Sequence, residues 1–335
     1  MTSVLVTGAT GVIGPNLVSR LVAEGYRVRV LARSSMPEGL LPDSVEVVRG
    51  DIADRAAVSR AVEGASIVFH LAAKLHINNP SPGLLGEYRR VNVEGTRVLT
   101  ELAQKTGVKR LVFFSSIAVY GRSARGEVLD EDSPLAPTSI YGQTKLEAER
   151  IALAAQRRDG VPLAVVLRLA GVYGPRIKGD YRRLVIAMRQ GWFLPVGSGT
   201  NRRTLIHERD VAEAALLAAE HPDAAGRIFN LTDGSIHSFA QIVEAICKNL
   251  GRRPPRYCIA LGPVLAAARI VDAGFRVGGR GGKAVPMVTK LVEDMAVSGD
   301  RIRDVLGFEP RVGLVAGWRT AIPAIMDATD ITRTA

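Results

Sequence analysis

Short apolar runs alternate with longer amphipathic stretches along the first half of the chain. Six runs predict strands, at residues 3–8, 26–32, 45–50, 66–72, 110–116 and 163–170. They are almost continuously apolar, as strands buried on both faces of a parallel sheet are. Apolar spacings of three and four between them predict helices at 12–24, 55–62, 87–104 and 141–158. This alternation predicts an α/β fold, a Rossmann-like doubly wound parallel sheet with helices on both faces.

The pattern changes after Gly174. The stretch "GVYGPRIKGD" predicts a loop, and the helices expected at 210–220, 238–249 and 300–306 are separated by long connections that contain Pro and Gly. We therefore expect an NAD(P)-binding domain at 1–174 and a smaller, mainly substrate-binding C-terminal lobe at 175–335. A further strand at 227–232 is expected to return to the first sheet.

Composition narrows the class of protein. The two cysteines have no paired spacing, so neither a disulfide framework nor a zinc site is expected, and a reducing cytoplasmic location is predicted. The histidines predict no metal site. The apolar segment 258–275 contains Pro263, Arg269 and Asp272, so no integral membrane segment is expected. The net charge of +11 comes from basic residues in small groups without interleaved aromatics, which favours a solvated surface over nucleic-acid binding.

The first predicted strand runs directly into a glycine-rich turn, "TGATGVIG", with Gly8, Gly11 and Gly14 before the first helix. Glycine at such a turn lets the backbone approach a pyrophosphate, whose charge the free N–H groups and the helix dipole stabilise. We expect the backbone of Val12 and Ile13 to take part in the same contact. The position between strand and helix predicts an NAD(P) site.

The ends of the next two strands bear on the identity of the cofactor. An NAD-binding chain usually has an acidic residue after the second strand, whereas this one has Ala32 and then Arg33. A guanidinium suits a 2′-phosphate, so this position favours NADP, although NAD held by other contacts stays possible. Asp51 and Ile52 are expected beside the adenine ring, with capping of the next helix as the alternative for Asp51.

Three residues far apart in the sequence are candidates for proton transfer. Ser116 ends the fifth predicted strand, at the sheet edge where ligands bind in this kind of fold. Tyr141 and Lys145 are four residues apart and share one face of a helix. A tyrosine with a pKa of about 10 is a weak base at neutral pH, but a nearby ammonium and a positive nicotinamide ring favour its phenolate. We expect Ser116 to bind the substrate oxygen while Tyr141 exchanges its proton.

These motifs resemble the extended short-chain dehydrogenase/reductase family, which includes nucleotide-sugar epimerases, dehydratases and 4-keto reductases. The resemblance extends over nearly the whole chain through "TGATGVIG", "GDI", "HLAA", "VNVEGT", "SSIAVYG", "YGQTK", "LRLAGVYGP" and "RTLIHERDVAEA". It implies that Leu71, Ala72, Ala73 and Asn92 lie along the cofactor. It also implies that Lys74 and Arg203 contact the substrate together with Ser116, Arg203 at a diphosphate, and that Asp210 is structural.

Two departures from the family pattern shape the functional hypotheses. Gly171 stands where members acting on nucleotide sugars often have asparagine, and Ile117 and Ala118 stand where dehydratases carry a carboxylate pair. Dehydration is therefore not expected. The first hypothesis is a 4-epimerase or 4-keto reductase of a nucleoside-diphosphate hexose, with UDP as the nucleotide.

Two other functions compete with it. One is an NADP-dependent reductase or dehydrogenase of a hydrophobic alcohol or ketone, such as a sterol or flavonoid. Residues 259–275 would then line an apolar pocket or rest on a membrane, although an ordinary lid or core helix is the favoured interpretation of that segment. The other is a non-catalytic dinucleotide sensor, which the intact proton-transfer set disfavours. By family analogy we expect a homodimer through the helices at 87–104 and 141–158.

Overall fold

The computed structural model describes residues 1–75, 83–277 and 284–334. In this part of the chain seven parallel strands form one sheet in the order β3-β2-β1-β4-β5-β6-β9. The strands are β1 (Ser3–Thr7), β2 (Arg27–Ala32), β3 (Glu46–Arg49), β4 (Ile67–His70), β5 (Arg110–Ser116), β6 (Ala164–Leu169) and β9 (Ile228–Leu231). The order reverses between β1 and β4, and a crevice for a ligand is expected at the carboxyl ends of the strands there. The predicted Rossmann-like fold is confirmed.

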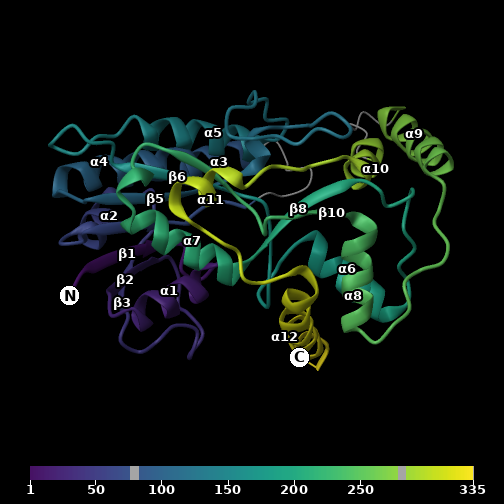
Figure 1. Cartoon of the computed structure of the whole chain (residues 1–335), viewed down its shortest axis with the longest axis horizontal. Coiled ribbons are helices and arrows are strands. Elements are labelled where there is room, and N and C mark those ends of the chain that lie inside the picture. Colours follow the sequence, from purple (N-terminus) through teal and green to yellow (C-terminus); the bar gives the residue numbers. More distant parts are fainter. Residues whose placement is uncertain (76–82, 278–283, 335) are drawn as a thin grey trace.

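Helices cover both faces of this sheet (Figure 1). On one face α1 (Gly14–Ala23) and α7 (Glu208–Glu220) pack over Val4 and Val6. On the other face α2 (Arg55–Val62), α4 (Gly95–Thr106) and α5 (Ile140–Leu153) pack over Leu5 and Phe113. Successive strand residues point to opposite faces, so the continuous apolar runs in the sequence build both cores.

Two predicted helices differ from those observed. The helix expected at 87–104 is a succession of α3 (Leu84–Tyr88), a π-helical segment η1 (Arg89–Glu94) and α4, which ends at Gly107 with φ +82°. The helix expected to reach residue 158 ends at Leu153. The chain reverses there, because Gln156 forms a bridge with Pro162 and the Arg157 N–H donates to the Val161 carbonyl at 2.8 Å.

A second, three-stranded sheet lies beyond the main one. Its strands are β7 (Gly171–Tyr173), β8 (Arg202–His207) and β10 (Ile236–Ser238), in the order β10-β8-β7. The loop predicted at 171–180 is therefore wrong for its first three residues, which are too few to show a strand period. Helices α6 (Asp180–Gln190), α8 (Phe239–Asn249) and α12 (Leu314–Thr334) pack around the fully buried Trp318.

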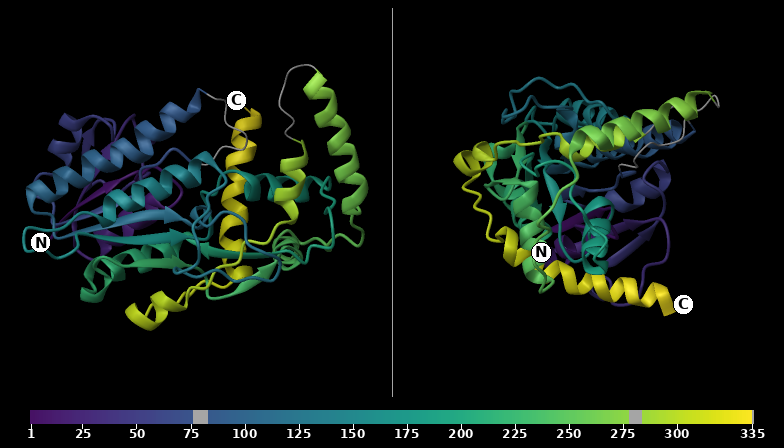
Figure 2. Two further views of the ribbon diagram at one scale, coloured as in Figure 1. Left: turned by 90° about the horizontal axis from the view of Figure 1, so that it is seen from above. Right: turned by 90° about the vertical axis from the view of Figure 1, so that its right-hand side faces the viewer.

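The C-terminal half returns to the main sheet. The strand predicted at 227–232 is confirmed, since β9 pairs with β6, and α11 (Asp300–Leu306) packs against β9. Two helices, α9 (Leu261–Val277) and α10 (Ala284–Val292), stand together at the end of the molecule far from the N-terminus (Figure 2).

Candidate active site

The glycine turn between β1 and α1 is shaped to receive an anion. A Cβ on Gly8, whose φ is +74°, would lie 2.6 Å from the Ala72 nitrogen, and one on Gly14 would collide with the Ala9 backbone. Those two glycines therefore allow close packing, whereas Gly11 meets only the Gly8 carbonyl oxygen, at 3.2 Å. Helix α1 begins after Ile13 with no side-chain cap and no acidic residue in its first turn. The N–H groups and dipole at this end are thus available to a pyrophosphate, and the turn fits the predicted cofactor.

Three predicted site residues line one small pocket beside the turn. Arg33, Ala73 and Lys74 surround a cavity of about 260 Å³ together with Leu75 and Val91. The Lys74 ammonium pairs with Glu87 at 2.9 Å, and Arg33 makes no ion pair with any residue that the structure describes. The Arg33 guanidinium is therefore available at this end of the site.

The residues after β3 and in η1 are held by protein contacts. Asp51 pairs with Arg90 at 3.0 Å and accepts a hydrogen bond from the Ala53 N–H, while Asp54 caps α2, so the alternative of Asp51 as that cap is wrong. The buried Asn92 side chain accepts from the Lys74 N–H at 2.7 Å and donates to the Thr144 hydroxyl at 3.1 Å. Asn92 thereby ties the segment after β4 to α5.

The three candidates for proton transfer lie on two adjoining elements. Ser116 ends β5, and Tyr141 and Lys145 lie on the first turns of α5, which packs on β5. The Ser116 hydroxyl is hydrogen-bonded to Tyr141 and also accepts from the Ala118 N–H at 3.2 Å. The Lys145 ammonium lies 4.2 Å from the centre of the Phe113 ring. Ser116 and Tyr141 therefore meet at the carboxyl end of β5, and the role of the three residues in proton transfer stays a prediction.

Burial shifts the pKa values of Tyr141 and Lys145. It raises the pKa of Tyr141 to about 12, although the hydrogen bond with Ser116 acts to lower that pKa. Burial also lowers the pKa of Lys145 to about 7, although the Glu149 carboxylate opposes that shift. Tyr141 is therefore a protonated phenol at neutral pH, and activation by Lys145 stays a prediction for the cofactor-bound protein.

The comparison with known proteins decides the family. The model of the NAD dependent epimerase/dehydratase family matches residues 4–232, which is more than half of the chain. The chain belongs to this family. It is thus an NAD(P)-dependent enzyme of the extended short-chain dehydrogenase/reductase type, as its motifs indicated.

Individual relatives of this epimerase-family enzyme span nearly its whole length. A UDP-glucose 4-epimerase of Vibrio cholerae is 31% identical over 340 residues, covering 98% of this chain and 97% of that protein. A 3 beta-hydroxysteroid dehydrogenase/Delta 5→4-isomerase of Mycobacterium tuberculosis is 32% identical over 328 residues, covering 92% and 86%. The solved structure of MoeE5 in complex with UDP-glucose and NAD has a TM-score of 0.75 and 32% identity, covering 98% of this chain and 99% of that one.

A buried ion pair fixes α5 of this epimerase-family enzyme to the main sheet. Glu149 lies one turn beyond Lys145 on α5, and Arg168 lies on β6; each side chain is at most 2% exposed. The Arg168 Nη2 and Nε donate to Glu149 at 2.8 and 3.1 Å, and the Ser115 hydroxyl donates to the same carboxylate. Ser115, beside Ser116, therefore has a structural role.

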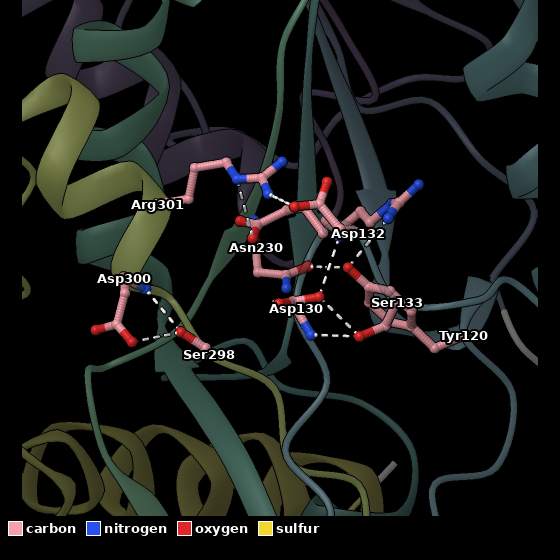
Figure 3. Close-up of polar contacts among 10 residues, drawn as sticks. Tyr120, Asp130, Asp132, Ser133, Asn230, Ser298, Asp300 and Arg301 are labelled. Carbon is pink, nitrogen blue, oxygen red and sulfur yellow. Dashed lines mark hydrogen bonds and ion pairs between the residues drawn. The ribbon is translucent and has the colours of Figure 1, made fainter.

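The polar contacts of Arg168 continue through Tyr120 and Asn230 toward Arg301, and Figure 3 shows these last three residues. The Arg168 Nη1 donates to the Tyr120 hydroxyl at 3.0 Å, which in turn donates to the Asn230 Oδ1 at 2.7 Å. The Asn230 N–H donates to Glu131 at 2.6 Å, and Glu131 faces Arg301 of α11 at 3.5 Å. Sequence reasoning missed this network, although an arginine within the apolar run of β6 was a signal for it.

Three further residues of the sequence analysis lie in or beside the two sheets. The buried His70 ring is hydrogen-bonded to the Thr7 and Thr96 hydroxyls at 2.7 and 2.9 Å, and burial lowers its pKa to about 3. Asp210 accepts from the Arg311 and Val312 N–H groups, which confirms its structural role. Arg203 is half-buried on β8, and its contact with a substrate stays a prediction.

Proposed function

We propose that this enzyme epimerises C4 of a UDP-hexose. The observation that carries the proposal is the hydrogen bond between Ser116 at the carboxyl end of β5 and Tyr141 on α5, at the same sheet edge as the glycine turn after β1. The full-length similarity to a UDP-glucose 4-epimerase and to a structure holding UDP-glucose and NAD supports the substrate class.

The chain's own residues handle the proton in this reaction. When bound, the nicotinamide supplies the hydride acceptor and donor. The Ser116 hydroxyl orients the C4 oxygen, and Tyr141 takes the C4 hydroxyl proton as the keto sugar forms and returns it when the sugar is reduced on its other face. Lys145 stabilises the Tyr141 phenolate. Arg203 and Lys74 are the proposed substrate contacts.

A hydrophobic alcohol is the second candidate substrate, and one observation favours it. A Cβ on Gly171 would lie 2.8 Å from the Leu205 Cδ2, so apolar packing occupies the place where nucleotide-sugar enzymes of this family often have asparagine. The relative named as a 3 beta-hydroxysteroid dehydrogenase is about as similar to the chain as the epimerase is.

A substrate panel separates the two candidates. UDP-hexoses should raise the melting temperature of the purified enzyme, whereas a 3β-hydroxysteroid should not, because only a binding ligand stabilises the folded state. Incubation with UDP-glucose should give UDP-galactose without net change in NAD(H), read by chromatography and absorbance at 340 nm. Steady reduction of NAD(P) by the steroid, with no response to UDP-sugars, would reject the proposed epimerase.

Arg33 should set the preference for a 2′-phosphate. We expect Arg33→Ser to weaken NADP binding by about 10- to 100-fold, as loss of one charged hydrogen bond does, and to leave NAD binding unchanged. Arg27→Ser, an exposed arginine at the opposite end of β2, is the matched control. Dissociation constants from titration calorimetry give both values. Equal weakening for the two cofactors would show that Arg33 does not read the phosphate.

A further inference from the structure

Helix α9 has apolar residues on its outer side as well as its inner side. Leu261, Val264, Leu265 and Ala268 face inward, whereas Pro263, Ala266, Ala267, Ile270, Val271 and Ala273 are exposed. Ile270 is 74% exposed, and Arg269 is the one charged side chain on the outer side among those that the structure describes. A helix that is apolar all round normally lies against a second apolar surface.

A second exposed apolar segment adjoins the start of α9. The Ile259 N–H donates to the Pro195 carbonyl at 2.8 Å and the Gly197 N–H donates to the Ile259 carbonyl at 2.9 Å, so residues 192–197 run beside residues 257–259. Trp192 is 85% exposed and Tyr257 is 79% exposed. We call Trp192, Leu194, Tyr257, Ile259, Ile270 and Val271 the apolar tip. Aromatic residues with a polar edge are enriched where apolar and aqueous phases meet.

The positive charge of the chain is concentrated in the sequence segment that contributes most of the apolar tip. Residues 245–292 contain nine lysines or arginines and one acidic residue, Asp272, so they carry a net charge of +8 out of +11 for the chain. Asp272 is buried and accepts from the Ala284 and Val285 N–H groups at the start of α10, which fixes α9 against α10. The exposed charged residues described near the start of α9 and on its outer side are arginines, namely Arg252, Arg253, Arg256 and Arg269.

We propose that the apolar tip docks onto an anionic lipid surface, with α9 in the plane of the interface. Exposed apolar side chains, interfacial aromatics and a surrounding positive charge are together what such a surface binds. None of the helices within the described residues is both long and apolar enough to cross a bilayer, so the contact is with the surface. Helix α9 lies at the opposite end of the molecule from α4 (Figure 1), which belongs to one of the two helical segments through which sequence reasoning expects a dimer, the other being α5.

Vesicle binding tests the proposal on the full chain. It should co-sediment with vesicles of phosphatidylcholine and phosphatidylglycerol in equal parts, and much less with phosphatidylcholine alone, and salt should weaken the binding. The emission of Trp192 should shift to the blue on binding; the other tryptophan, Trp318, is fully buried and should not respond.

Substitutions on the exposed surface locate the contact. Ile270→Glu and Arg253→Glu should each lower the partition coefficient at least tenfold. Val315→Glu on α12 and Arg60→Glu on α2 are the matched controls, because they likewise place glutamate at an exposed aliphatic and an exposed basic residue elsewhere. Both should leave the partition coefficient within twofold. Circular dichroism checks that every variant is folded. No binding of the wild type to anionic vesicles overturns the proposal, and so does a concentration-dependent dimer that Ile270→Glu alone abolishes, since a second copy then covers the tip.

Discussion

Tyr141→Phe should lower kcat by about 10²- to 10⁴-fold, the usual contribution of a positioned acid or base. The phenol is the group from α5 that is hydrogen-bonded to Ser116 at the end of β5, and its removal takes away the proton donor and acceptor without changing the apolar ring. Binding of NAD(P) should stay within about threefold of wild type, because the glycine turn and the Arg33 pocket are separate from this hydroxyl. Steady-state kinetics and cofactor titration measure the two effects.

A matched control removes another tyrosine hydroxyl. Tyr26 donates to Glu220 on the surface, far in sequence from the catalytic group, and Tyr26→Phe should keep full kcat. If Tyr141→Phe is as active as Tyr26→Phe, the catalytic assignment of Tyr141 is wrong. The control also separates loss of chemistry from any general effect of losing a phenol.

Arg168→Met should lower the free energy of unfolding by about 3–5 kcal/mol, since it leaves the Glu149 carboxylate buried without its counter-ion. Both side chains are almost fully buried, and the Ser115 hydroxyl, which also donates to Glu149, carries no charge that could replace the guanidinium. Urea denaturation at pH 7 measures the change. Arg55→Met, which breaks an exposed pair with Glu101, should cost less than about 1 kcal/mol.

A double variant distinguishes the charge effect from lost packing. Glu149→Leu combined with Arg168→Met removes both charges, so its stability should exceed that of Arg168→Met alone. If the stability lost in the double variant equals the sum of the losses in the two single variants, the two side chains act independently. The buried pair would then not be what holds α5 on the sheet.

Much of the candidate site could be predicted because its signals are local. A turn with three spaced glycines between a strand and a helix indicates a pyrophosphate site, wherever the strand lies in the sheet. Tyr141 and Lys145 share a helix face through their spacing alone. Ser116 follows from the rule that parallel strands present their carboxyl ends at one edge.

The sequence by itself determined most of the strands and helices of the main sheet, and it identified the glycine turn and the Tyr141–Lys145 pair of α5 as candidates for the chemistry. Only the tertiary structure decided that Gly8 packs on the backbone at Ala72, that Asn92 joins the segment after β4 to α5, and that Arg168 meets Glu149. The physical reason is the separation along the chain: periodicity shows how one segment lies against a core, whereas a hydrogen bond between residues 18 or more positions apart depends on how whole elements pack. The same reason explains why β7, a strand of three residues, could not be predicted, since its pairing with β8 rather than its own pattern makes it a strand.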